Sequence, residues 1–236
     1  THPSSACFAV AGPLSNNKAK IINLSWDISG NALQNKFNLK SCELINDFAV
    51  QIYGIPYLKN NQYSIIQNGS HFEGANNDLH AIVGAGTGLG IARGIISGNK
   101  VKVLASEGGH VEYSPKSNLE WELKIWLKNY LKIERISCER IVSGSGLSRI
   151  AEWRLSKPDA QNHPLQKYLK EMKISDSARK ELPEKICKLS KEGDQLMIEV
   201  ERIWLGAYAS LLGDVALQEL CLSLIHISEP TRLLRI

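Results

Sequence analysis

Seven residues that include four glycines constrain the fold of this chain more than any other segment: Gly84-Ala85-Gly86-Thr87-Gly88-Leu89-Gly90. Apolar runs lie on both sides of them, at residues 81–83 and 91–96, and Ser97-Gly98-Asn99 then leads into a further run at residues 101–104. Short apolar runs separated by glycine-rich turns are typical of antiparallel strands. The sequence therefore predicts a hairpin with a glycine loop at its tip, followed by another strand.

The glycine loop matches neither of the common nucleotide-binding motifs. A dinucleotide fingerprint would need a third glycine where the chain has Leu89 or Ile91, and a P-loop would need a Gly-Lys-Ser or Gly-Lys-Thr ending. Two interpretations stay open. Backbone N–H groups and the Thr87 hydroxyl can approach an oxyanion closely because glycines leave the loop unobstructed, or the glycines only supply the positive φ angles of a tight hairpin.

Residues 106–110, Ser-Glu-Gly-Gly-His, place a carboxylate and an imidazole on a backbone that can turn sharply. Such groups hydrogen-bond to vicinal hydroxyls, so Glu107 and His110 are candidates for holding a sugar. The alternative is that both side chains are simply solvated on a surface loop.

A third candidate follows the apolar run at residues 42–45, which ends at Asn46-Asp47. Apolar residues then recur at 48, 49 and 52, the spacing of a helix, until glycine and proline at residues 54–56 stop it. Asp47 is therefore expected where a strand passes into a helix. There it can cap the helix, or its carboxylate, kept ionised by the helix N-terminus, can accept a proton from an attacking hydroxyl.

The remaining segments predict a mixture of strands and helices. Residues 6–12 suit a buried strand, Ser117 and Glu120 form a capping box at the start of a helix, and residues 156–193 suit short helices. A long helix is expected from Asp194, with one apolar stripe formed by Leu196, Val200, Ile203, Ala207, Leu211 and Val215.

Composition and charge argue against several classes of protein. The 236 residues are 43% hydrophobic and 22% charged, which is ordinary for a globular protein. The net charge of +4 is small, and basic residues alternate with acidic ones, so no nucleic-acid partner is expected. No apolar run is long enough to predict a membrane span. The five cysteines include no Cys-x-x-Cys pair, so we expect reduced, mostly buried thiols and no zinc site.

Four segments, taken in order, resemble the bacterial glucokinase family, with cyanobacterial and algal forms nearest. They are Ile-Asn-Asp-Phe at 45–48, the glycine loop at 84–90, Glu-Gly-Gly-His-Val-Glu-Tyr at 107–113 and Ser-Gly-Ser-Gly-Leu at 143–147. Ile-Asn-Leu-Ser-Trp at 22–26 is similar to a further family segment. The resemblance implies an α/β, two-domain hexokinase and actin-like fold of the ribonuclease H-like type, in which the domains close over a cleft.

The resemblance also implies roles for individual residues. Asp47 would be the catalytic base. The residues implied to hold sugar hydroxyls are Asn46, Glu107, His110 and Glu139. Those implied to contact the phosphates of ATP are Gly84, Gly86, Thr87 and Gly88. Mg²⁺ would arrive on ATP, and no residue of this chain is assigned to a metal. The implied reaction is phosphorylation of the 6-hydroxyl of glucose; the alternatives are a kinase for another hexose and a non-catalytic sugar sensor of the same fold.

The resemblance divides the chain into three parts. We expect residues 1–57 to belong to an incomplete small domain and residues 58–222 to form the large domain. Residues 223–236 resemble translated sequencing-adaptor read-through, so we expect a non-native tail. The family's first phosphate loop and its Gly-Gly adenosine motif have no counterpart here, so we expect a fragment that lacks both native ends and is itself inactive. For the intact protein we expect glucose and ATP as partners, a candidate homodimer, and a location in the cytoplasm or, after loss of a transit peptide, in a plastid.

Overall fold

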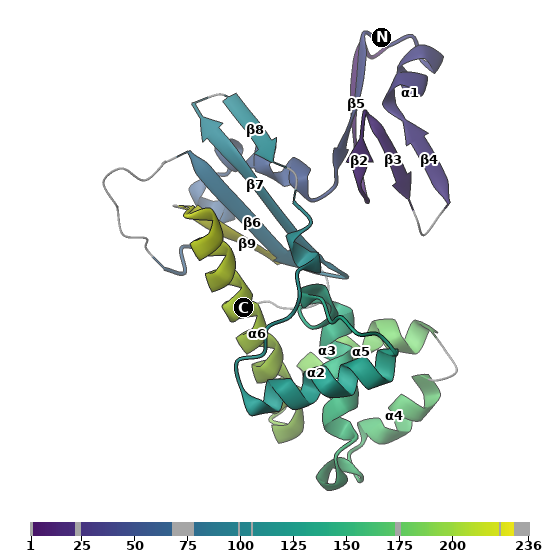
Figure 1. The fold of residues 1–236 in the computed structure, drawn as a ribbon, viewed down its shortest axis with the longest axis vertical. Coiled ribbons are helices and arrows are strands. Elements are labelled where there is room, and N and C mark those ends of the chain that lie inside the picture. The colour runs from purple at the N-terminus through teal and green to yellow at the C-terminus, as the bar shows by residue number, and fades with distance from the viewer. Residues whose placement is uncertain are drawn as a thin grey trace.

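The computed structural model describes residues 2–21, 25–67, 78–98, 100–104, 106–172, 176–221 and 223–228. Three groups of elements follow one another along its longest axis (Figure 1). Strands β1 to β5 and helix α1 lie at one end, a sheet of β6 to β9 lies in the middle, and most of the helices lie at the other end. Residues 22–24 of the segment 22–26, residue 222 and residues 229–236 of the expected tail lie outside the described residues.

The N-terminal group contains two small sheets. Its elements are β1 (Ser5–Val10), β2 (Leu14–Ser15), β3 (Lys18–Ile21), β4 (Trp26–Ser29), α1 (Gly30–Lys36) and β5 (Ser41–Asn46). The strand predicted at residues 6–12 is confirmed as β1, which pairs in parallel with β5 so that Val10 lies opposite Asn46. The second sheet is antiparallel, in the order β2-β3-β4.

The central sheet contains the glycine hairpin. Its strands are β6 (Leu79–Ala85), β7 (Leu89–Ser97), β8 (Lys100–Leu104) and β9 (Ser223–Ser228), in the order β8-β7-β6-β9. The antiparallel pairing of β6 with β7 and of β7 with β8 confirms the predicted hairpin and the strand after it. β9 pairs in parallel with β6, so part of the expected tail forms an edge strand of this sheet.

The helical group covers residues 118–219. Its α-helices are α2 (Asn118–Leu131), α3 (Gly144–Leu155), α4 (Leu165–Met172), α5 (Asp176–Lys191) and α6 (Gln195–Glu219). The 3-10 turns of this group are η5 (Cys138–Arg140) and η6 (Pro158–Ala160), whereas η2 (Ala49–Tyr57), η3 (Asn60–Gln62) and η4 (Gly108–His110) precede it in the chain. The prediction of only short helices in residues 156–193 was wrong for α5, which continues through Pro183. Leu182 and Ile186 are fully buried on it, and this packing offsets the hydrogen bond that proline removes.

Side-chain caps begin the two helices whose starts the sequence predicts. Ser117 Oγ accepts a hydrogen bond from Glu120 N at 3.2 Å, and Asp194 Oδ1 accepts one from Met197 N at 3.0 Å. The Glu120 carboxylate accepts a hydrogen bond from Lys116 N, whereas in a standard capping box the donor is the N–H of the N-cap residue, here Ser117. The apolar stripe of α6 is confirmed: all its predicted members are buried except Leu196, which is half-buried.

Both faces of the central sheet are covered, as the alternation along β6 requires. Ala81, Val83 and Ala85 pack with α6 and the other helices in the larger hydrophobic cluster. Ile82 faces the opposite side, where it packs with Ile52 of η2 in a smaller cluster. η2 therefore lies on the sheet face opposite α6.

The cysteine prediction was correct in part. Cys42 and Cys138 are buried, but Cys187 and Cys221 are half-buried and Cys7 is exposed. Cys7 lies in β1, whose two-stranded sheet leaves most of its side chains exposed.

Candidate functional site

The tip of the β6–β7 hairpin is closed by backbone hydrogen bonds. Gly86 N donates to Gly88 O at 2.9 Å, and Thr87 between them is exposed. Gly84 lies inside β6, paired with Gly90 and buried, so it belongs to the strand and not to the turn. The turn therefore offers an exposed hydroxyl and unobstructed backbone, which is the arrangement that suits an oxyanion.

Helix α3 begins directly beside this turn. Gly144 N donates to Gly86 O at 2.8 Å, and the N-cap Ser143 accepts from Gly146 N at 3.0 Å. A side chain at Gly146 would place its Cβ 1.9 Å from Ile141 O, so only glycine fits at this position. The positive end of the α3 dipole consequently lies next to the glycine turn, where it favours negative charge.

Glu139 reaches the hairpin from η5, just before α3. Its carboxylate oxygen Oε2 accepts a hydrogen bond from Leu89 N at 3.2 Å. The same oxygen lies 2.8 Å from the position that a Cβ on Gly88 would occupy. Glu139 is therefore in direct contact with the end of the glycine loop.

The segment with Glu107 and His110 also contacts Leu89, through the carbonyl of that residue. A Cβ on Gly109 would lie 2.2 Å from Leu89 O, so the backbones touch there. Both predicted sugar ligands are exposed, with Glu107 Oε2 and His110 Nε2 3.7 Å apart. The backbone of this segment is fixed by Arg135, whose Nη2 donates to His110 O at 2.6 Å.

Asp47 follows β5 directly and its side chain is exposed. Of the two roles that the sequence left open for Asp47, the structure does not show the helix cap. Asn46 is the capping residue, since its Oδ1 accepts hydrogen bonds from Phe48 N at 3.0 Å and Ala49 N at 2.9 Å, and the element that follows is a 3-10 helix. The Asn46 oxygen is thereby occupied, whereas its Nδ2 makes only a 3.5 Å contact with Gly12 O.

Phe48 connects Asp47 to the hairpin. Its ring occupies the space beside Gly90, where a Cβ would lie 2.4 Å from ring atoms. Segments far apart in sequence thus contact three consecutive residues where the turn passes into β7: Gly88 in the turn, and Leu89 and Gly90 in the strand. The structure brings the predicted sugar and base segments together around the glycine hairpin through these contacts.

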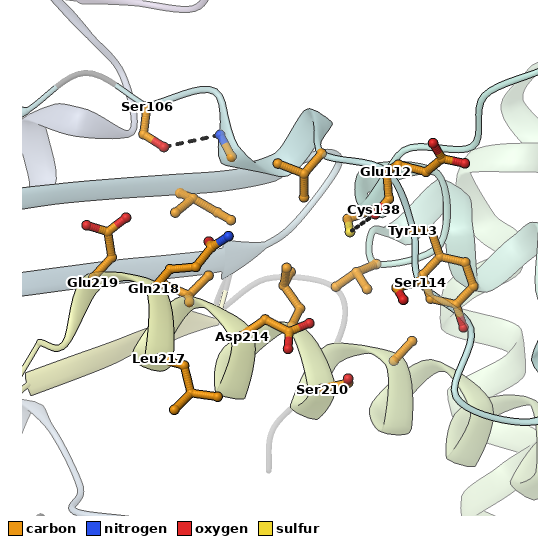
Figure 2. Close-up of a pocket in the computed structure, with 17 residues that line it drawn as sticks. Ser106, Glu112, Tyr113, Ser114, Cys138, Ser210, Asp214, Leu217, Gln218 and Glu219 are labelled. Atoms are coloured by element: carbon orange, nitrogen blue, oxygen red, sulfur yellow. Dashed lines mark hydrogen bonds between the residues drawn. The ribbon is translucent and has the colours of Figure 1, made fainter.

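A cavity of about 370 Å³ lies between α6 and residues 106–114 (Figure 2). Gly108 borders it, but Asp47, Glu107, His110 and Glu139 do not line it. The Cys138 thiol on its wall is held protonated, because burial raises its pKa to about 11. Burial and the hydrogen bond to Glu120 also raise the pKa of Tyr113, so neither group supplies an anion at neutral pH.

Within the described ranges, no group of three or more His, Cys, Asp or Glu side chains is arranged to hold a metal ion. No helix in the part of the chain that the structure describes combines the length and apolar character needed to cross a bilayer.

A family model for glucokinase matches residues 1–228. The chain belongs to the glucokinase family. This confirms the resemblance drawn from the four ordered segments. The chain is 37% identical to a glucokinase of Synechocystis sp. over 219 residues, which covers 90% of the chain and 61% of that relative. The chain therefore spans about three fifths of the length of this curated relative.

Solved structures of glucokinases share the fold. Glucokinase from an Antarctic psychrotroph has a TM-score of 0.71 and 27% identity, covering 95% of this chain and 64% of its own. A ROK-family glucokinase from Streptomyces griseus, solved with glucose and AMPPNP, has a TM-score of 0.53 and 19% identity, covering 93% of this chain and 64% of its own. The predicted α/β, hexokinase and actin-like fold class is confirmed.

Three residues that join these segments were not singled out from the sequence. Leu89 supplies the backbone N–H and C=O that two other segments contact, Phe48 fills the space beside Gly90, and Ser143 fixes Glu139 by donating from Oγ to Glu139 O at 2.6 Å. One signal was available for the first two. A glycine within a strand often marks the close approach of another segment, so Gly88 and Gly90 could have been read as contact points.

Proposed function

We propose that this protein is a glucokinase that transfers the γ-phosphoryl group of ATP to the 6-hydroxyl of glucose. The observation that carries the proposal is the convergence of the Asp47, Glu107–His110 and Glu139 segments on residues 88–90 in a chain of the glucokinase family. The Streptomyces griseus relative, whose structure contains glucose and AMPPNP, supports the choice of sugar and nucleotide.

In this proposal the sugar is oriented by hydrogen bonds to its hydroxyls. Its ligands would be the Nδ2 group of Asn46, the carboxylates of Glu107 and Glu139, and the imidazole of His110. A site built from such groups rejects molecules that lack the matching hydroxyl, because its polar atoms would then stay unpaired. Orientation is the main protein contribution to phosphoryl transfer.

The transfer itself needs one proton acceptor. The 6-oxygen of glucose forms a bond to the γ-phosphorus while the bond from that phosphorus to the bridging oxygen of ADP breaks. Asp47 accepts the proton that leaves the 6-hydroxyl. The exposed position of Asp47 beside the hairpin leaves its carboxylate accessible to a substrate.

The phosphates are assigned to the hairpin turn and the start of α3. Backbone N–H groups at Gly86 and Gly88, the Thr87 hydroxyl and the α3 dipole would stabilise negative charge there. Gly84, which lies within β6, would contribute by leaving room at the base of the loop. Mg²⁺ would enter as part of its complex with ATP and would neutralise charge on the phosphates.

A chimera tests the proposed activity. Residues 6–221 of this chain are joined to the segments of the Synechocystis relative that lie outside the match, and the relative itself is the positive control. We expect ATP-dependent phosphorylation of glucose and none of 6-deoxyglucose, which lacks the acceptor hydroxyl. Mannose and fructose, assayed in parallel, define the hexose specificity. A folded chimera that bound glucose but did not phosphorylate it would contradict the proposal and favour a sugar sensor.

A further inference from the structure

Glu139 makes a contact that binding a sugar does not require. Its Oε2 atom accepts a hydrogen bond from Leu89 N at 3.2 Å, although the two residues are 50 positions apart. Leu89 is the first residue of β7, directly after the turn that is assigned to the phosphates. One predicted sugar ligand therefore accepts a hydrogen bond from the first residue after the loop proposed to bind phosphates.

The backbone of Glu139 is held firmly, so its side chain acts from a fixed point. Ser143, which is fully buried, donates from Oγ to Glu139 O at 2.6 Å. The carbonyl of Ser143 in turn accepts a hydrogen bond from the indole Nε1 of Trp204 on α6 at 3.0 Å. These contacts tie Glu139 to the larger hydrophobic cluster.

The loop is shaped to admit this carboxylate. Any side chain at Gly88 would begin 2.8 Å from Glu139 Oε2 and 3.6 Å from its carboxyl carbon. The first distance is shorter than normal non-bonded contacts permit, so a larger residue at position 88 must displace the Glu139 side chain. The identity of one residue in the phosphate loop thus controls the position of a sugar ligand.

We propose that Glu139 is a positioning residue that couples sugar binding to the order of the phosphate loop, an inference that rests on the proposed function. Oε2 holds the Leu89 amide, while Oε1, to which no residue of the described ranges donates, accepts a hydrogen bond from a sugar hydroxyl. A carboxylate has about four acceptor positions, so both bonds can exist together. A sugar that holds the Glu139 carboxylate in place therefore also stabilises the ordered conformation of the loop. Because such coupling is reciprocal, an ordered loop raises the affinity for the sugar by the same factor.

Substitution of Gly88 tests the coupling from the phosphate side. Gly88→Ala should weaken glucose binding by about tenfold in calorimetry without any nucleotide, because it displaces Glu139. Gly206→Ala is the matched control: a Cβ there meets no atom within 4 Å, and glucose affinity should stay within about twofold. Unchanged affinity in a folded Gly88→Ala variant would overturn the inference.

Amide exchange of Leu89, measured by NMR on the full chain, tests the contact directly. Without ligand, Glu139→Ala should speed this exchange by about tenfold, whereas Glu139→Gln should preserve most of the protection because its amide oxygen still accepts. Glucose should slow the Leu89 exchange of the unaltered chain more than that of β6 amides, which report general stabilisation by a ligand.

The outcomes separate the two proposals. If glucose binds but leaves the Leu89 amide unaffected, or if Glu139→Ala leaves ligand-free exchange unchanged, the coupling is overturned and the proposed function stands. If the unaltered chain and the chimera both fail to bind glucose, the proposed function falls, and the coupling that rests on it falls too.

Discussion

The two faces of the central sheet are packed very differently. On one face, β6 belongs to a continuous cluster that includes residues of α2, α3, α5 and α6. On the other face, the fully buried members among the described residues are Ile52, Ile82 and Ala92, beneath η2. Buried apolar area is the main force that holds an element in place. The segment after Asp47 is therefore attached by a much smaller apolar contact than the segment that carries Glu139.

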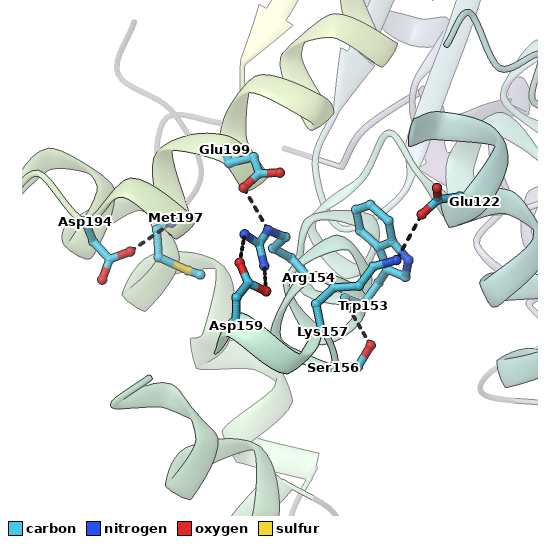
Figure 3. A network of polar contacts seen from close by, with 9 residues as sticks. All are labelled: Glu122, Trp153, Arg154, Ser156, Lys157, Asp159, Asp194, Met197 and Glu199. Atoms are coloured by element: carbon cyan, nitrogen blue, oxygen red, sulfur yellow. Dashed lines mark hydrogen bonds and ion pairs between the residues drawn. The ribbon is translucent and has the colours of Figure 1, made fainter. Parts of the chain in front are cut away.

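Polar contacts increase this contrast. In the helical group, Arg154 of α3 donates to Glu199 of α6 at 2.7 Å and makes a two-point ion pair with Asp159 of η6 (Figure 3). The start of η2 is held by the local cap of Asn46 Oδ1 on Phe48 N and Ala49 N. The comparison therefore separates a well-packed framework, which carries Glu139 and the loop proposed to bind phosphates, from a segment with less apolar packing, which carries the proposed base Asp47. A movable base segment suits an enzyme that closes over its substrates.

The largest expected effect on stability comes from truncating a large buried side chain in the larger hydrophobic cluster. Trp153 on α3 is 1% exposed, so Trp153→Ala should cost about 3–5 kcal/mol in the free energy of unfolding. Trp121→Ala, at a position that is 52% exposed, is the matched control and should cost under about 0.5 kcal/mol. Urea denaturation measures both, and equal losses would contradict the packing described for this face.

A smaller and more local effect is expected on the opposite face. Ile52 is fully buried, but its cluster is small, so Ile52→Ala should cost about 2 kcal/mol, at the lower end for such truncations. Hydrogen exchange should show residues 49–57 opening while α6 stays protected. Ile150→Ala, at a fully buried position on α3, should instead reduce protection throughout the helical group. Loss of exchange protection at the same residues in Ile52→Ala and Ile150→Ala would contradict the difference in packing between the two faces.

The smallest effect concerns the start of α6. Burial, the strongest single influence, would raise the pKa of Asp194, but hydrogen bonds from Met197 N and His163 outweigh it and leave the pKa below its ordinary value. Because the folded state lowers this pKa, the carboxylate stabilises the protein above about pH 4, and the contribution is lost as the pH falls through the folded value.

Two variants separate the charge of Asp194 from its cap. Asp194→Asn should keep the cap, cost under about 1 kcal/mol at neutral pH and flatten the acid side of the stability profile. Asp194→Ala also removes the cap, so it should be about 1 kcal/mol less stable than Asp194→Asn at every pH. Identical pH profiles for the unaltered chain and Asp194→Asn would show that the ionised form of this group contributes nothing.

Local patterns in the sequence predicted the elements around the site. Alternating apolar runs predicted the β6–β7 hairpin, and the side chains of Ser117 and Asp194 predicted helix starts. These features depend on residues close together in the chain, and short-range rules describe them well. The sequence left a cap by Asp47 open, whereas Asn46 supplies it; the two are adjacent residues of the same capping type, and only the backbone geometry selects between them.

Contacts across long stretches of chain could not be predicted in this way. The hydrogen bond from Leu89 N to Glu139 depends on how η5 is placed against β7, which the core under α3 and α6 determines. The packing of Phe48 on Gly90 depends likewise on η2 folding back over the sheet. The resemblance to glucokinases supplied the candidate residues, and the tertiary structure supplied the contacts that join their segments.

The turnover of Asp47→Ala in the chimera with the Synechocystis relative tests the central claim most directly. With Asp47 as the proton acceptor, kcat for glucose phosphorylation should fall by about 10²–10⁴. Glucose affinity, measured by calorimetry on the same variant, should change by less than about threefold, because the proposed sugar ligands Glu107, His110 and Glu139 lie outside the segment that carries Asp47. Turnover close to that of the unaltered chimera would remove Asp47 from its role and contradict the convergence of the base, sugar and phosphate segments on one site.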